Sequence, residues 1–214
     1  MLEAVDLECV RGDRPLFSHL SFSLRPGELL HVTGVNGSGK TTLLRALCGL
    51  THAHAGEIRW NGTAIQKLGD EYHAQLAYVG HANGIQGDLT PEENLRVAMS
   101  LSGSHDAEQI GAALNRLGLA AYHRFPSKIL SQGQKRRLAL ARLMVERKPL
   151  WILDEPLSGL DVDSVSLMTT ILMEHLAQGG PIIITSHQDI QVQTKTVLQI
   201  QARAAGLANR FLNR

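Results

Sequence analysis

Apolar and polar residues alternate along the N-terminal part of the chain, a pattern typical of strands with one buried face. The alternation predicts strands at 2–9, 16–24 and 29–32, with Pro26-Gly27 as the turn between the last two. A further strand is expected at 57–60, where Asn61-Gly62 closes it with a strong hairpin signal.

Three later segments, 76–79, 150–153 and 181–185, are short and almost continuously apolar, which favours strands buried on both faces of a sheet. Helical periodicity follows at 107–117 and 134–145, and Thr90-Pro91-Glu92-Glu93 has the form of a capped helix start. Asp161 can cap another helix running to about Ala177. The order of these segments predicts one α/β domain, with a core and β part at 1–80 and 149–214 and a helical insertion at 81–148.

Charge, apolar runs and cysteine positions disfavour several classes of protein. The chain has 214 residues and a net charge of +1, so it carries no strong electrostatic signal for nucleic acid. Lys135-Arg136-Arg137 indicates a solvated face or a contact between subdomains instead. No apolar run approaches the roughly 18 residues that cross a bilayer, and the acidic, alternating N-terminus does not resemble a signal peptide. Cys9 and Cys48 are expected to be buried thiols, which favours a reducing cytoplasm.

The segment after the strand at 29–32 has the P-loop pattern of a glycine, four residues, and then Gly-Lys-Thr. Glycines let the backbone approach an anion, and the start of the following helix adds N–H groups and a partial positive charge. The Lys40 ammonium can reach the β- and γ-phosphates of a nucleotide, and the Thr41 hydroxyl can bind Mg²⁺. The predicted ATP-binding residues of the loop are Gly34, Val35, Asn36, Gly37, Ser38, Gly39, Lys40, Thr41 and Thr42.

Two carboxylates end the buried strand at 150–153. Asp154 is placed to hold Mg²⁺, and Glu155 is placed to orient or deprotonate an attacking water. His187 follows the strand at 181–185. A second candidate anion site lies at Leu130-Ser131-Gln132-Gly133-Gln134, directly before a predicted helix.

In this order and spacing, the motifs resemble those of the ATP-binding subunits of ABC transporters, and the resemblance covers nearly the whole chain. It implies a P-loop NTPase core of the RecA type, an antiparallel β subdomain and an inserted helical subdomain. It also implies Walker A and B motifs, a signature at 130–134 with Gln132 in place of a glycine, a D-loop at 158–161, and His187 as the switch histidine. We therefore expect catalytic roles for Lys40, Glu155 and His187, and contacts of Ser131, Gly133 and Gln134 with ATP.

The same resemblance predicts ATP and Mg²⁺ as cofactors and a head-to-tail homodimer in which each ATP lies between one P-loop and the partner's signature. Integral membrane transporter subunits are the other expected partners, which places the chain peripherally on the cytoplasmic face of a bacterial inner membrane. No nucleic-acid partner is expected.

Two positions depart from the family pattern. Arg11 stands where an aromatic residue usually stacks on adenine, and a guanidinium plane can also stack on a base. Phe17 is the weaker candidate because it falls in the strand pattern. His81 stands where the Q-loop glutamine is expected, with Gln86 five residues later. An imidazole can accept a hydrogen bond or contact Mg²⁺-bound water, so His81 is expected to replace the glutamine.

The segment 78–85, with 150–156 and 186–188, further resembles the ATPases of the bacterial cytochrome c biogenesis (haem export) systems. The alternative within transporters is the ATPase of an importer or of a lipoprotein-release system. A soluble ABC ATPase acting on ribosomes or DNA is disfavoured by the near-neutral charge and short length, and a small-molecule kinase by the segment at 131–134.

Overall fold

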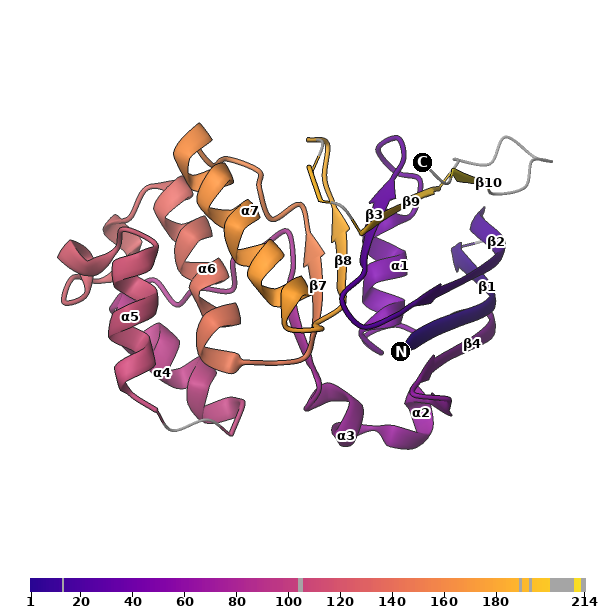
Figure 1. The fold of residues 1–214 in the computed structure, drawn as a ribbon, viewed down its shortest axis with the longest axis horizontal. Coiled ribbons are helices and arrows are strands. Elements are labelled where there is room, and N and C mark those ends of the chain that lie inside the picture. The colour runs from indigo at the N-terminus through magenta and orange to yellow at the C-terminus, as the bar shows by residue number, and fades with distance from the viewer. Residues whose placement is uncertain (13, 104–105, 189, 193, 201–209, 213–214) are drawn as a thin grey trace.

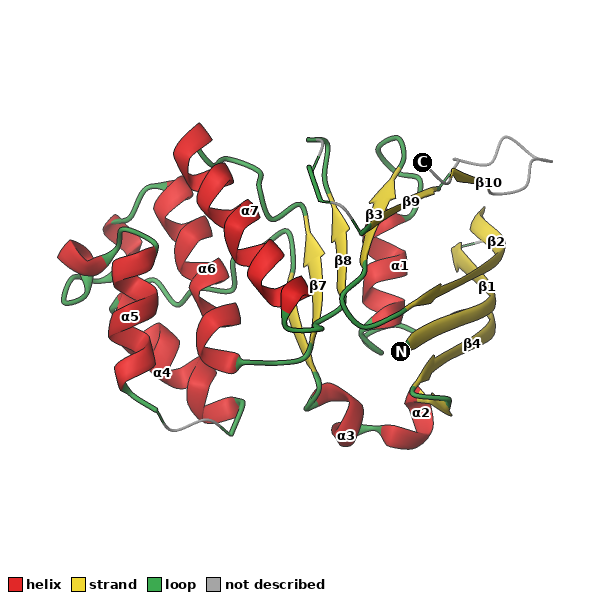
Figure 2. Cartoon of the chain, in the orientation of Figure 1, coloured by secondary structure: helices red, strands yellow, loops and turns green. Residues whose placement is uncertain are grey.

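The structure is a computed structural model, and it describes residues 1–12, 14–103, 106–188, 190–192, 194–200 and 210–212. Two sheets and a group of helices form the chain (Figures 1 and 2). The central sheet has six strands in the order β10-β9-β3-β8-β7-β6. Its strands are β10 (Arg210–Leu212), β9 (Lys195–Gln199), β3 (Leu29–Thr33), β8 (Ile182–Thr185), β7 (Leu150–Asp154) and β6 (Leu76–Val79). All neighbouring pairs are parallel except β10 with β9.

The second sheet is antiparallel, with four strands in the order β2-β1-β4-β5. These are β2 (Arg14–Leu24), β1 (Leu2–Arg11), β4 (Ala55–Trp60) and β5 (Thr63–Ala64). Asn61 and Gly62 join β4 to β5 with φ of 50° and 81°, the left-handed values of the two-residue turn that the sequence predicts.

Seven α-helices complete the described chain: α1 (Lys40–Leu47), α2 (Ile65–Leu68), α3 (Asp70–His73), α4 (Pro91–Leu101), α5 (Glu108–Arg116), α6 (Gln132–Glu146) and α7 (Val162–Ala177). Short 3₁₀ turns lie at Ala120–Tyr122 and Ser127–Ile129. The predicted Thr90 capping box and the Asp161 cap are confirmed, since the Thr90 hydroxyl accepts from Glu93 N and the Asp161 carboxylate from Ser164 N. No helix in the described part of the chain is long and apolar enough to cross a membrane.

The side chains of β7 divide the hydrophobic core into two parts. Leu150 and Ile152 belong to the cluster that includes α1 and the antiparallel sheet. Trp151 and Leu153 belong to the cluster that includes α4, α5, α6 and α7. Figure 1 shows α1 between the two sheets, α2 beside β4 of the antiparallel sheet with α3 next to it, and α4, α5, α6 and α7 on the opposite side of the central sheet. A strand covered on both faces is apolar throughout, which explains the unbroken run at 150–153.

The predicted α/β class with a parallel sheet is therefore confirmed, and the two cysteines are free and buried as expected. Strand β9, strand β10 and the four-residue helices α2 and α3 were not among the predicted elements.

Candidate functional site

The loop between β3 and α1 has a backbone conformation that favours glycine at two positions, Gly34 and Gly39. Gly34 has φ of 148°, and a Cβ there would lie 2.4 Å from Ile200 O. Gly39 has φ of 103° and precedes the first turn of α1, where no described side chain caps the helix. The N–H groups of that turn therefore point into the site, where they can bind an anion.

Lys40 and Thr41 begin α1 and face the end of β7. The Lys40 ammonium donates to Gly34 O at 2.7 Å and to Val35 O at 3.3 Å, so the side chain folds back over the loop. The Thr41 hydroxyl donates to Asp154 Oδ2 at 2.8 Å across 113 residues of sequence. The P-loop and the strand-end carboxylate thus form one site.

Asp154 is 2% exposed and has both carboxylate oxygens engaged. Its second oxygen, Oδ1, accepts from the Thr185 hydroxyl at 2.7 Å, and that hydroxyl accepts in turn from Glu155 N at 2.8 Å. Thr185 lies at the end of β8, beside Asp154 in the parallel register. A hydroxyl and a carboxylate within one hydrogen bond of each other are hard oxygen donors, so Thr41 and Asp154 fit a Mg²⁺ ion.

Glu155 directly follows β7 with φ of 51°, a left-handed value that is rare for glutamate. Its side chain is 17% exposed, and Oε1 lies 3.5 Å from Nε2 of His187, whose side chain is 64% exposed. Within the described residues, Oε1 has no hydrogen-bond partner. A carboxylate oxygen that is shielded but unbonded is suited to receive a proton from a bound water.

These side chains open onto one cavity of about 480 Å³. Its lining residues are Arg11, Leu16, Asn36, Gly37, Gly39, Lys40, Thr41, Thr42, His81, Asp154, Glu155, Ser158 and His187. The structure thus gathers most of the predicted ATP, metal and catalytic residues, and it adds Leu16 and Ser158. Of the predicted loop residues, Gly34, Val35 and Ser38 do not line the cavity, and the Ser38 side chain is buried.

The segment at 130–134 lies outside this cavity. Ser131 caps α6: its hydroxyl accepts from Gln134 N, and the Gln134 side chain accepts from Ser131 N. Gly133 packs against the chain after β7, and a Cβ there would lie 3.1 Å from Gly159 O. Gln132 is exposed, which explains why a side chain is accommodated at that position, whereas a side chain at Gly133 would make a tight contact with Gly159 O.

A protein-family model described as ABC transporter matches residues 17–158. The chain belongs to the ABC transporter family. Within this family it corresponds to the ATP-hydrolysing subunit, so the predicted family and the predicted ABC-type ATPase are confirmed.

Curated relatives cover nearly the whole chain. The cytochrome c biogenesis ATP-binding export protein CcmA of Nitrosomonas europaea is 54% identical over 198 residues, 92% of this chain and 93% of the relative. The protein of the same name from Dechloromonas aromatica is 50% identical, covering 94% of this chain and 99% of its own. That from Yersinia pseudotuberculosis is 44% identical, covering 94% and 92%.

Solved structures of ABC proteins share the fold. The ATP-binding subunit of an ABC transporter superposes with a TM-score of 0.85 at 25% identity, covering 95% of this chain and 88% of that one. A dimeric ATP-binding cassette in a post-hydrolysis state, bound to ADP and Pi, superposes with a TM-score of 0.84 at 19% identity over the full length of both chains.

The two departures from the ABC pattern line the cavity at the P-loop. Arg11 and His81 are exposed and line it together with the P-loop. Phe17 is 1% exposed and packs beneath Gly39, so its ring is not available to a base, whereas Leu16 does line the cavity. The roles of Arg11 in stacking and of His81 near Mg²⁺ stay predictions.

Proposed function

We propose that this chain is the ATP-hydrolysing subunit of a bacterial cytochrome c biogenesis (haem export) system of the ABC type. The similarity to CcmA proteins of three organisms, at 44–54% identity over nearly the whole chain, supports this system over an importer or a lipoprotein-release ATPase. The observation that carries the chemistry is the hydrogen bond between Thr41 and Asp154, because it joins the P-loop to the carboxylates.

ATP would lie with its phosphates along the first turn of α1. The Lys40 ammonium binds the β- and γ-phosphates, and Arg11 or Leu16 contacts the base. Thr41 and Asp154 would hold Mg²⁺, with His81 contacting a water of the ion. The metal, when bound, neutralises charge that develops on the phosphates.

Hydrolysis needs a water aligned with the γ-phosphate and a base to take its proton. We assign Glu155 as that base and His187 as the donor that orients the water or contacts the γ-phosphate. The 3.5 Å separation of His187 Nε2 and Glu155 Oε1 places both groups against one small volume.

The signature residues would complete the site of a second copy. Ser131, Gly133 and Gln134 lie outside the chain's own nucleotide cavity, so they contact ATP only when another chain presents them. The Ser131 hydroxyl uses its oxygen as the helix cap, which leaves its proton free to be donated to a γ-phosphate. A head-to-tail homodimer satisfies this arrangement.

The membrane subunits would dock where 81–148, the proposed helical subdomain, meets the core. Two cavities of about 440 and 200 Å³ adjoin there and share Ala98, Leu101 and Arg142. Leu101 is 85% exposed and Val97 is 50% exposed, so α4 presents apolar surface to a partner. The segment after His81 lines the smaller cavity, which links docking to the nucleotide site. The chain would thereby sit on the cytoplasmic face of the inner membrane.

Two single substitutions test the chemical assignment. Glu155→Gln should keep ATP binding and lower hydrolysis by about 10²-fold or more, because it removes the base and leaves the phosphate contacts in place. Lys40→Ala should lose both, since Lys40 contacts phosphates before and during the reaction. ATP binding and phosphate release on purified protein measure the two effects. Near wild-type turnover in Glu155→Gln would contradict the assignment of the base.

A further inference from the structure

Arg136 lies in α6 and is 5% exposed, although it belongs to a run of three basic residues. A guanidinium has five N–H donors, and here every one of them has an acceptor. The acceptors and distances are Pro156 O at 3.1 Å, Gly80 O at 2.9 Å, Asn83 Oδ1 at 3.1 Å, Asp154 O at 2.9 Å and Glu155 O at 2.8 Å. A buried charge with all of its donors satisfied is costly to disturb.

The acceptors belong to two neighbouring strand ends. Three of them are consecutive carbonyls at the end of β7, and one of these belongs to Glu155 itself. The other two, Gly80 and Asn83, lie on either side of His81 after β6. The Arg136 side chain thus connects the backbone next to His81 and the backbone of Glu155 to α6, the helix that begins at the signature.

The backbone of Glu155 needs such support because it is strained. Its left-handed φ of 51° is maintained only where the surroundings fix it, and its N–H is already bonded to the Thr185 hydroxyl. Arg136 holds the carbonyls before, at and after this peptide. Burial lowers the pKa of the Arg136 guanidinium, and the charges of Asp154 and Glu155 oppose that change, so the side chain stays charged.

We propose that Arg136 is a positioning residue: it holds the Glu155 carboxylate and the His81 segment in one geometry and ties that geometry to the orientation of α6. The inference rests on the proposed role of Glu155 as the base. Because α6 also carries Ser131 at its start, a movement of α6 that presents the signature to a second chain also moves the base. Hydrolysis would then be sensitive to the position of the helical part.

The first experiment compares Arg136→Lys with Arg137→Lys in the purified full-length chain. An ammonium has at most three donors and cannot span both strand ends, so kcat of Arg136→Lys should fall at least 10-fold. The dissociation constant for Mg-ATP should change less than 3-fold because the P-loop is untouched. Arg137 is the matched control: its Nη1 bonds Leu117 O within the helical part, and Arg137→Lys should keep kcat within 2-fold.

A double variant separates positioning from general destabilisation. If Arg136 acts through Glu155, adding Arg136→Lys to Glu155→Gln should lower kcat by less than 2-fold beyond Glu155→Gln alone. A full additional 10-fold loss, or an unchanged kcat in Arg136→Lys alone, would overturn the inference. If Arg136→Lys folds poorly, Arg136→Gln is measured instead, and its rate is divided by the number of sites that bind ATP. The expected result is the same: kcat falls at least 10-fold, and the dissociation constant for Mg-ATP changes less than 3-fold.

The two proposals can fail separately. If Glu155→Gln loses turnover while Arg136→Lys keeps it, the function stands and the role of Arg136 is wrong. If Glu155→Gln itself remains active, the proposed base is wrong whatever Arg136 does.

Discussion

Thr185 hydrogen-bonds to both residues that carry the proposed site carboxylates, Asp154 and Glu155, although it is not itself predicted to bind a ligand. It is fully buried, and its hydroxyl donates to Asp154 Oδ1 while accepting from Glu155 N. Removing the hydroxyl leaves a buried carboxylate oxygen and a buried N–H without partners, which costs more than the loss of a neutral hydrogen bond. Strand β8, which ends at Thr185, therefore stabilises the positions of Asp154 and Glu155.

We expect Thr185→Val to lower the free energy of unfolding by about 2–3 kcal/mol and to reduce kcat at least 10-fold. Thr185→Ser keeps the hydroxyl and should lose about 1 kcal/mol or less. Thr169→Val is the control, because the Thr169 hydroxyl only donates to Val165 O along α7. Urea unfolding and ATPase rates measure the set. Equal stability of Thr185→Val and Thr169→Val would rule out the bridging role.

The sequence could predict the site residues that lie in local motifs, because a P-loop or a strand ending in two carboxylates has a recognisable spacing. Arg136 and Thr185 have no such signal. Their partners are brought to them by the pairing of β6, β7 and β8 and by the packing of α6, none of which is local in sequence. Their roles could therefore be recognised only in the structure. For Arg136, a contact between subdomains was one of the two interpretations of the basic run Lys135-Arg136-Arg137.

At the scale of elements, a stacked pair of rings, His175 of α7 and Trp151 of β7, packs the helix against the strand. The rings of His175 and Trp151 stack with centroids 3.7 Å apart and planes 9° from parallel, and His175 Nε2 lies 3.0 Å from Pro149 O. Gly180 leaves room for the ring, since a Cβ there would lie 2.1 Å from Nε2. Burial lowers the pKa of His175 from 6.5 to about 4, against the smaller effect of its bond to Pro149.

This shift predicts a pH-dependent stability. The unfolded chain binds a proton at His175 below about pH 6.5 while the folded chain does not, so the contribution of His175 is complete above pH 6.5 and decreases as the pH falls towards 4. After allowance for partial solvation, the loss should be about 1–2 kcal/mol. His175→Gln cannot titrate, so its deficit in unfolding free energy relative to wild type should shrink over that range. A deficit constant from pH 7 to 4.5 would show that the ring titrates normally.

Elements with local signals were predictable, and those that depend on distant partners were not. The capping box at Thr90 and the Asn61-Gly62 hairpin are specified by adjacent residues, and both have the expected form. In β9, by contrast, only Leu198 is fully buried, and the strand exists because it pairs with β3. Helices α2 and α3 have four residues each, too few for a helical period to show.

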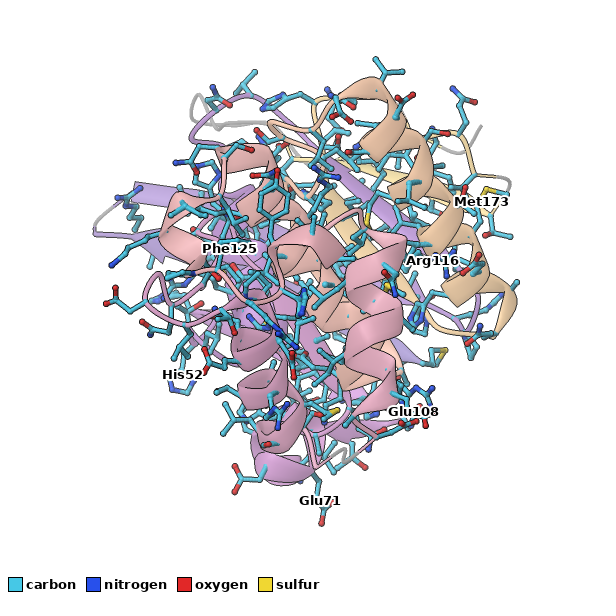
Figure 3. The ribbon with its side chains drawn as sticks, turned by 90° about the vertical axis from the view of Figure 1, so that its left-hand side faces the viewer. His52, Glu71, Glu108, Arg116, Phe125 and Met173 are labelled. Atoms are coloured by element: carbon cyan, nitrogen blue, oxygen red, sulfur yellow. The ribbon has the colours of Figure 1, made fainter. Side chains whose placement is uncertain are left out.

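At the scale of the whole molecule, the two adjoining cavities lined by Ala98, Leu101 and Arg142 form the proposed docking groove, and the exposed apolar side chains of Val97 and Leu101 on α4 lie in it. Leu101→Glu should weaken association with the membrane subunits at least 10-fold, because it places a charge in the groove, while the ATPase of the isolated chain stays within 2-fold. Met173→Glu is the matched control: Met173 is 51% exposed on α7, on the helical face seen in Figure 3, and lines neither groove cavity. Co-purification from detergent-solubilised membranes measures the effect. Equal recovery of both variants would place the docking surface elsewhere.

Two copies of the chain should complete each other's proposed ATP sites, each P-loop facing the partner's signature. Ser131→Arg destroys the signature and Lys40→Ala destroys the P-loop, so neither pure variant has a complete site if Ser131 acts on the partner's ATP. A heterodimer of the two chains contains one intact composite site, and a random mixture should recover up to about a quarter of wild-type activity.

The control dimer contains the same two substitutions, but both are on one chain and the other chain is wild type. A chain with both Ser131→Arg and Lys40→Ala, paired with a wild-type chain, leaves every composite site with one damaged half. Heterodimers isolated with two affinity tags should therefore be active in the first pairing and inactive in the second. If each chain completed its own site, the wild-type half would make the second pairing active and the first inactive. The position of Ser131 outside the cavity that holds Lys40 and Glu155 favours the first outcome.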